Sequence, residues 1–146
     1  MSKVFKLGIT SKNNQEIKEV ESIEVLADKG VVGDRHFKNF NEPYCQLSLI
    51  ESENIDHYNI KYGLNISYIN FRRNIVTKGI QLNELVGKKF KIGNVKVEGI
   101  DLCRPCRHLT EILSQNNILK EFLRKGGLRC KILSSSKITI GDKIVY

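Results

Sequence analysis

Two segments in the second half of the chain limit the folds open to it most strongly. Residues 88–100, KKFKIGNVKVEGI, alternate apolar and polar side chains on both sides of Gly93-Asn94, a dipeptide typical of a two-residue turn. Residues 137–146 repeat this design around Gly141-Asp142. We therefore predict two β-hairpins, one over each segment.

Most of the remaining chain is also typical of short strands. Apolar runs bounded by turn residues predict strands over residues 4–9, 20–30, 44–50, 71–79 and 128–133. Apolar residues at helical spacing predict a helix that Ser52 caps and Gly63 ends. Two further helical patterns lie at Leu109–Leu113 and over residues 118–123, where Gly126-Gly127 ends the second pattern.

The order of these elements indicates the fold class. Strands and helices do not alternate regularly, which argues against a doubly wound parallel sheet. We expect a mainly β protein, a closed or partly closed antiparallel β-barrel with a few peripheral helices. A chain of 146 residues without a linker-like segment is expected to form one domain over residues 1–146.

Charge and hydropathy restrict the partners and the compartment. The net charge of +8 and the pI of about 9.4 favour a phosphate-bearing or otherwise anionic partner. Nucleic acid fits less well, because the chain has no Trp and no basic run interleaved with aromatic residues. No apolar run is long enough for a bilayer, and the N-terminus lacks the apolar core of a signal peptide, so we expect a cytoplasmic protein with no membrane partner.

Two of the four cysteines lie three residues apart in DLCRPCRHL, residues 101–109. Cytoplasmic thiols usually stay reduced, so the cysteines indicate chemistry, metal binding or burial rather than a disulfide scaffold. Cys106 follows a predicted strand and Pro105, and a helix is expected to begin near Arg107. Free backbone N–H groups, the helix dipole and nearby arginines would stabilise a Cys106 thiolate.

Other interpretations of the pair stay open at this point. A thioredoxin-like dithiol fits the local turn, but the βαβ pattern that usually surrounds it is missing. A structural zinc site needs four ligands, and the chain has no second CxxC or HxxxH. Plain burial suits the sequence Arg-Pro-Cys-Arg-His poorly, because two arginines and a histidine are not core composition.

Two arginine motifs are ambiguous when taken singly. Gly33-Asp34-Arg35-His36 is compatible with a surface turn, and also with an arginine that holds phosphate in bidentate fashion. Residues 71–74, FRRN, are compatible with an exposed strand edge or with an oxyanion clamp. Their common order along the chain makes them informative.

That order resembles a known family. GDRH at 33–36, FRRNIVT with Gly79 at 71–79, IGNVKVEGIDLCRPC at 92–106, GLR at 127–129 and IGD at 140–142 are together similar to the MOSC domain, named after the C-terminal domain of molybdenum cofactor sulfurase. The resemblance covers about residue 20 to the C-terminus. It implies a mainly antiparallel β-barrel with peripheral helices, as in a small stand-alone bacterial member.

The resemblance also implies a site. Relatives such as the mitochondrial amidoxime-reducing component carry molybdenum on a pyranopterin, with a cysteine thiolate as ligand, and Cys106 matches that cysteine. Arg35 and the segment from Arg72 to Asn74 match positions that hold the phosphate and pterin of the molybdenum cofactor, molybdopterin. Arg129 is a further candidate. Arg73 stands where some relatives have Pro or Gly, and Cys103 is expected to be a packing residue or a neighbour of the site.

The expected function follows from this site. We expect a molybdenum-cofactor-binding protein that works as a small oxidoreductase on N-hydroxylated small molecules, with Cys106 as metal ligand. Electrons would come from a separate donor protein, since the chain carries no flavin, haem or iron–sulfur motif. One alternative is a carrier of the cofactor, or of sulfur received from a donor protein. Another is a basic β-barrel that binds nucleic acid.

Overall fold

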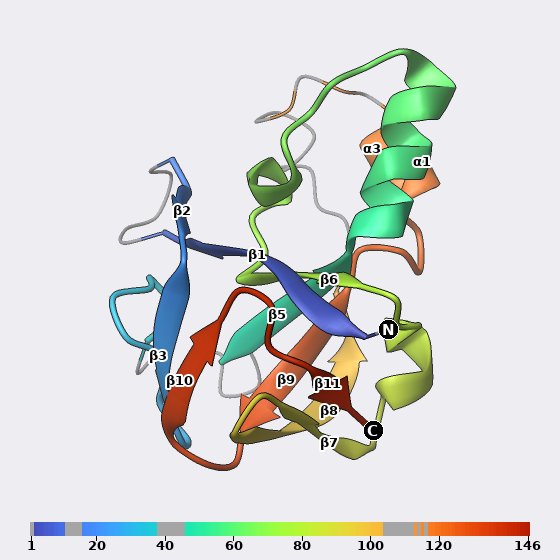
Figure 1. Cartoon of the computed structure of the whole chain (residues 1–146). Helices are drawn as coiled ribbons and strands as arrows, with labels where there is room; N and C mark the ends of the chain where they lie inside the picture. Colours follow the sequence, from blue (N-terminus) through green and yellow to red (C-terminus); the bar gives the residue numbers. More distant parts are fainter. Residues whose placement is uncertain (1, 11–15, 38–45, 104–112, 114, 116) are drawn as a thin grey trace.

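The structure, a computed structural model, describes residues 2–10, 16–37, 46–103, 113, 115 and 117–146 (Figure 1). Within these residues the strands form two sheets. The larger sheet has the order β11 (Ile144–Val145), β7 (Lys89–Ile92), β8 (Val95–Leu102), β9 (Leu128–Ile132), β5 (Leu47–Glu51), β6 (Ile75–Lys78), β1 (Lys3–Ile9) and β2 (Lys18–Val20). The smaller sheet has the order β10 (Ser136–Thr139), β3 (Ser22–Leu26) and β4 (Gly30–Val31).

The larger sheet curls until the chain beside β11 meets β1. Lys3 and Lys143 form an antiparallel bridge. The Ile144 N–H donates to the Ser2 carbonyl at 3.0 Å, and the Val4 N–H donates to the Asp142 carbonyl at 2.9 Å. The result is a curled half-barrel, which confirms the predicted mainly β class.

One strand pair departs from the antiparallel pattern. β5 and β6 are parallel, with Leu49 opposite Ile75, whereas the other strand pairs among the described residues are antiparallel. Neighbouring parallel strands need a crossover connection. Helix α1 (Ser52–Tyr62) and the 3₁₀-helix η1 (Tyr68–Phe71) supply it.

Two apolar cores lie on opposite faces of β5 and β6. The barrel interior contains Leu49 and Ile75, together with inward-facing residues of the surrounding strands. Ile50 and Val76 belong to a second cluster with residues of α1 and α3 (Ile118–Glu121). Because both faces are covered, three of the four residues of β6 are buried.

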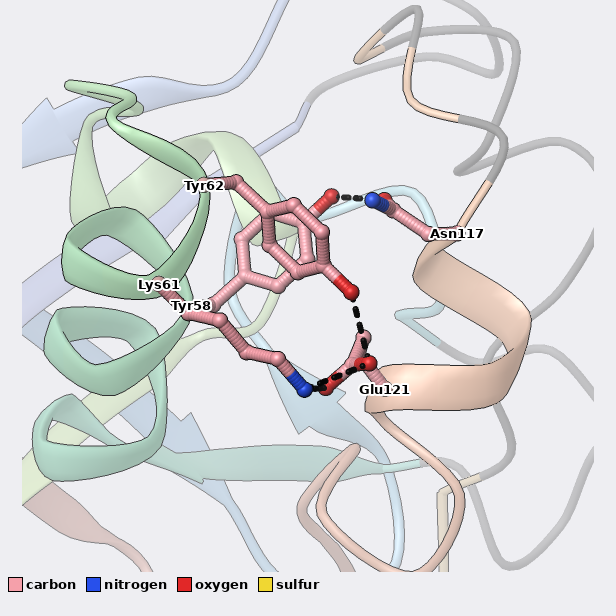
Figure 2. Close-up of polar contacts among 5 residues, drawn as sticks. All are labelled: Tyr58, Lys61, Tyr62, Asn117 and Glu121. Carbon is pink, nitrogen blue, oxygen red and sulfur yellow. Dashed lines mark hydrogen bonds and ion pairs between the residues drawn. The ribbon is translucent and has the colours of Figure 1, made fainter.

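The helices α1 and α3 are held together by a polar cluster (Figure 2). The Tyr62 hydroxyl donates to Glu121 Oε1 at 2.7 Å, and Lys61 Nζ reaches both Glu121 carboxylate oxygens at 3.1 and 3.2 Å. The Tyr58 hydroxyl donates to Asn117 Oδ1 at the start of α3. Hydrogen bonds from Tyr62 and Lys61 lower the pKa of the Glu121 carboxyl.

The predicted C-terminal hairpin is wrong. β10 pairs with β3 in the smaller sheet, whereas β11 pairs with β7 in the larger one. The Thr139 N–H donates to Asp142 Oδ2 at 2.9 Å, which forms a tight corner, and the Gly93 N–H donates to the Lys143 carbonyl at 2.8 Å. The turn was therefore predicted correctly, but it leads each strand to a different partner.

Three other boundaries differ from the prediction. Only Ile75–Lys78 of residues 71–79 is a strand, because Phe71 ends η1 and Arg72 adopts a left-handed conformation with φ 64°. The segment 20–30 is divided among β2, β3 and β4. Glu51, not Ser52, is the N-cap of α1, while Gly63 ends this helix with φ 62° as predicted.

The predicted helix over 118–123 is shorter than expected: it ends at Glu121, with Phe122 as its C-cap, before Gly126-Gly127. Of the helical pattern predicted at Leu109–Leu113, residues 109–112 lie outside the described part of the chain. No helix among the described residues is long and apolar enough to cross a membrane.

Candidate functional site

A pocket of about 490 Å³ opens where several strand ends of the curled sheet meet. Its walls come from the end of β1, the loop after β4, β5, the turn before β6, the end of β8 and the start of β9. The lining residues include four arginines: Arg35, Arg72, Arg73 and Arg129. Asp34 and Asp101 are the two carboxylates of the lining, so these groups leave the pocket positively charged.

Asp34 fixes the loop after β4 against the end of β1. Its Oδ1 accepts the Thr10 N–H at 2.9 Å and its Oδ2 accepts the His36 N–H at 3.3 Å. The Arg35 N–H donates to the Thr10 carbonyl at 2.6 Å. Asp34 is only 9% exposed, so its carboxylate holds the loop that presents Arg35 and His36 rather than facing solvent.

Asn74 links three elements of the pocket wall. Its Nδ2 donates to the Gly8 carbonyl at 3.2 Å and to Asp34 Oδ1 at 3.3 Å. Its Oδ1 accepts the Ser48 N–H at 3.2 Å, and its own N–H donates to Ser48 Oγ at 3.1 Å. Both amide hydrogens of this buried side chain are thereby used, which favours a positioning role over direct contact with a ligand.

Arg72 occupies a backbone conformation that favours glycine. Its φ of 64° closes η1, and its N–H donates to the Ile69 carbonyl at 2.9 Å. A left-handed conformation costs a non-glycine residue about 1–2 kcal/mol. A strained arginine on a pocket wall is typical of a residue kept for its side chain.

Arg73 and Cys103 converge on the Gly126-Gly127 dipeptide. Arg73 Nε donates to the Gly126 carbonyl at 2.9 Å, and the Cys103 N–H donates to the Gly127 carbonyl at 2.8 Å. Cys103 is the last described residue before the segment that carries Cys106. These bonds fix the point where that segment leaves the sheet.

Gly127 makes this junction possible. Its φ is 108°, and a Cβ at this position would lie 1.9 Å from the Leu49 carbonyl oxygen. Only glycine allows such a close approach of the backbone to β5. The sequence predicted a helix stop at Gly126-Gly127, but the glycine serves the contact between the junction and the sheet.

Cys103 and Cys130 are both free and buried. Burial raises the pKa of the Cys103 thiol, although the guanidinium groups of Arg73 and Arg129 oppose this shift. Burial also raises the pKa of the Cys130 thiol. Both thiols are therefore protonated near neutral pH and suit packing, as expected for Cys103.

Arg129 is paired on the pocket wall. It lies opposite Asp101 in the β8–β9 ladder, and its guanidinium forms a bidentate contact with that carboxylate, with Nε 2.6 Å from Oδ1. A guanidinium held in this way gives the wall a fixed shape. The orientation of the Arg129 guanidinium is therefore set by Asp101.

Four of the five predicted site residues line this one pocket: Arg35, Arg72, Asn74 and Arg129. The fifth, Cys106, lies outside the described residues. No group of three or more His, Cys, Asp or Glu side chains among residues that the structure describes is placed to hold a metal ion.

The sequence did not single out Asp34, His36 or Ser48 as residues of the site. Asp34 and His36 flank Arg35 in the GDRH motif, so the motif was a usable signal for them. Ser48 lies inside an apolar strand and carries no such signal.

This protein is a mainly β protein built on a curled half-barrel. Its arginine-lined pocket lies where several strand ends meet. The sequence pattern of the MOSC domain matches residues 33–145, and the chain belongs to this family. No curated protein matches the chain in sequence.

Solved structures share the fold at low sequence identity. The YuaD protein from Bacillus subtilis is 19% identical with a TM-score of 0.83, and the match covers 100% of this chain and 97% of YuaD. YiiM from Geobacillus stearothermophilus is 15% identical with a TM-score of 0.77, covering 99% of this chain and 74% of that protein. YiiM from Escherichia coli is 16% identical with a TM-score of 0.70, and the match covers 99% of this chain and 68% of that protein.

Proposed function

We propose that this protein binds the molybdenum cofactor in the arginine-lined pocket and acts as a small oxidoreductase on N-hydroxylated compounds. The observation that carries the proposal is the convergence of Arg35, Arg72, Arg73 and Arg129, from three separate parts of the sequence, on one pocket. The pocket volume of about 490 Å³ is in the range of small-molecule and cofactor sites.

The donor set of the pocket suits the anionic end of the cofactor. Guanidinium groups bind phosphate oxygens in a planar, bidentate way that lysines do not reproduce. Arg35 and Arg72, which match the phosphate-binding positions of the family, would hold the phosphate, while Arg73 and Arg129 fix the wall beside them through Gly126 and Asp101. Asn74 would hold the phosphate-binding loop in place through Asp34.

Cys106 would be the metal ligand. Cys103 lies on the pocket wall, and three residues of chain can span at most about 11 Å, so the reach from this wall is short. A soft thiolate suits molybdenum in a sulfur-rich environment. The bound group would supply the two-electron chemistry, and the chain would supply binding, orientation and charge.

Turnover tests the catalytic part of the proposal. Protein made in a host that synthesises molybdopterin is given a hydroxylamine or an amidoxime, with reduced viologen as an artificial electron donor. We expect formation of the amine or amidine, and loss of this activity in Cys106→Ser. A folded, cofactor-loaded protein that turns over no N-hydroxylated compound would instead support a carrier.

Nucleic acid binding is the outcome to exclude. Single-stranded RNA is titrated at several salt concentrations with the wild-type protein and Cys106→Ser. We expect at most weak binding. A steep salt dependence with high affinity, unchanged in Cys106→Ser, would support a basic β-barrel that binds nucleic acid.

A further inference from the structure

Arg35 and His36 form a hydrogen bond inside the pocket. Arg35 Nε lies 3.1 Å from His36 Nε2. The guanidinium stays protonated at every physiological pH, so its Nε–H is the donor and His36 Nε2 is the acceptor. The imidazole in this arrangement is neutral and carries its proton on Nδ1.

Asp34 lies beside His36, and both of its carboxylate oxygens are already engaged in hydrogen bonds. The His36 backbone N–H donates to Asp34 Oδ2 at 3.3 Å, and the other Asp34 oxygen accepts the Thr10 N–H and an Asn74 amide hydrogen. Among the residues that the structure describes, the other charged or titratable groups of the lining are Arg35, Arg72, Arg73, Asp101, Cys103 and Arg129. Asp101 pairs with Arg129, so the described lining groups carry mostly positive charge.

We propose that oxyanion binding at Arg35 is linked to protonation of His36 at Nε2. A dianionic oxyanion attracts the Arg35 Nε–H, which releases the lone pair of His36 Nε2. This nitrogen then takes one proton from solvent and becomes a second donor, about 3 Å from the first. One anion bridges the two donors, and its negative charge offsets the repulsion between imidazolium and guanidinium.

This inference rests on the proposed function, because the phosphate end of the cofactor is the natural dianion for the pocket. Binding and protonation are reciprocal: if the anion favours the proton, the proton favours the anion by the same factor. The pocket would therefore hold its anion more tightly at pH 6 than at pH 8. His36 acts as a switchable anion-binding residue beside Arg35.

Inorganic sulfate is the probe, because it stays dianionic across this pH range. Its affinity for the wild-type protein is measured by calorimetry from pH 5.5 to 8.5 at constant ionic strength. In parallel, NMR follows the imidazole titration of His36 and of His57, an exposed residue of α1. His36→Asn removes the proposed group, and His57→Asn is the matched control.

We expect sulfate to bind about tenfold more tightly at pH 5.5 than at pH 8.5, and the His36 titration midpoint to rise when sulfate is added. His36→Asn should flatten the affinity profile to within about twofold, while His57→Asn leaves it unchanged. Sulfate binding with the same pH profile in His36→Asn, or an unchanged His36 midpoint, would overturn the inference alone. No sulfate binding by the wild-type protein at any pH would overturn the anion site itself.

Discussion

Asn74 Nδ2 lies 3.3 Å from Asp34 Oδ1, and this contact joins the turn before β6 to the loop that presents Arg35. The two residues are 40 positions apart and both are at most 9% exposed. Asp34 also accepts the N–H of Thr10 at the end of β1. A buried amide and a buried carboxylate thus bring three separate segments to one pocket.

Replacing the amide of Asn74 tests this contact. Asn74→Asp puts an acceptor where Nδ2 donates to Gly8 and Asp34, and adds a negative charge beside the Asp34 carboxylate. We expect the free energy of unfolding in urea to fall by about 3 kcal/mol or more. Asn65→Asp, at an exposed position, should change it by less than about 0.5 kcal/mol. Equal effects of the two substitutions would contradict the role given to Asn74.

Arg72→Gly separates strain from binding. Glycine accepts the left-handed backbone at this position, so we expect the free energy of unfolding to stay within about 1 kcal/mol of the wild type. Sulfate affinity should fall at least tenfold. Arg124 has a similar φ of 62° but does not line the pocket, so Arg124→Gly should leave sulfate binding intact. A large loss of stability in Arg72→Gly alone would mean that the side chain is kept for packing.

Gly127→Ala tests the junction between β5 and the turn before β9. The new Cβ would lie 1.9 Å from the Leu49 carbonyl oxygen, at a φ of 108°. We expect a loss of about 4 kcal/mol or more in urea denaturation. Gly63→Ala shares a positive φ but meets nothing within 4 Å, and should cost only about 1 kcal/mol. Similar losses in both variants would show that the close approach is relaxed easily.

The α1–α3 contact should weaken in acid. The pKa of the Glu121 carboxyl is lowered by Tyr62 and Lys61, so its contribution to stability is complete above its ordinary value of 4.5 and is lost as the pH falls through the lowered value. We expect thermal unfolding of Glu121→Gln to differ from the wild type at pH 7 and to converge with it in acid. Glu84→Gln, at an exposed position of η2 (Leu82–Leu85), is the control. A constant difference from pH 7 to pH 3 would contradict the charge-assisted contact.

The parts of the fold that the sequence predicted depend on local signals. Gly93-Asn94 between alternating residues gives the β7–β8 hairpin, and Gly63 ends α1. The partner of a strand is not a local property. The segments beside Gly141-Asp142 have the same alternation as β7 and β8, yet they enter different sheets, because β10 pairs with β3 and β11 pairs with β7.

The candidate site also has a part that the sequence predicted and a part that it did not. Arg35, Arg72 and Arg129 were predicted as site residues from the family resemblance, and the structure brings them to one pocket; their roles stay predictions. The supporting contacts could not be assigned, because they join residues 24 to 66 positions apart, as from Asn74 to Gly8. The left-handed backbone of Arg72 was also missed, since the apolar run after it favoured a strand from residue 71.

Metal and pterin analysis of protein purified from a host that makes molybdopterin tests the central claim most directly. We predict close to one molybdenum and one pterin per wild-type chain, and loss of both in Cys106→Ser, which should unfold at the same temperature as cofactor-free wild-type protein. Cys130→Ala, at a buried core position, should keep both. A wild-type protein without molybdenum and pterin, or a Cys106→Ser variant that keeps them in full, would contradict the claim that Cys106 ligates a molybdenum cofactor in this pocket.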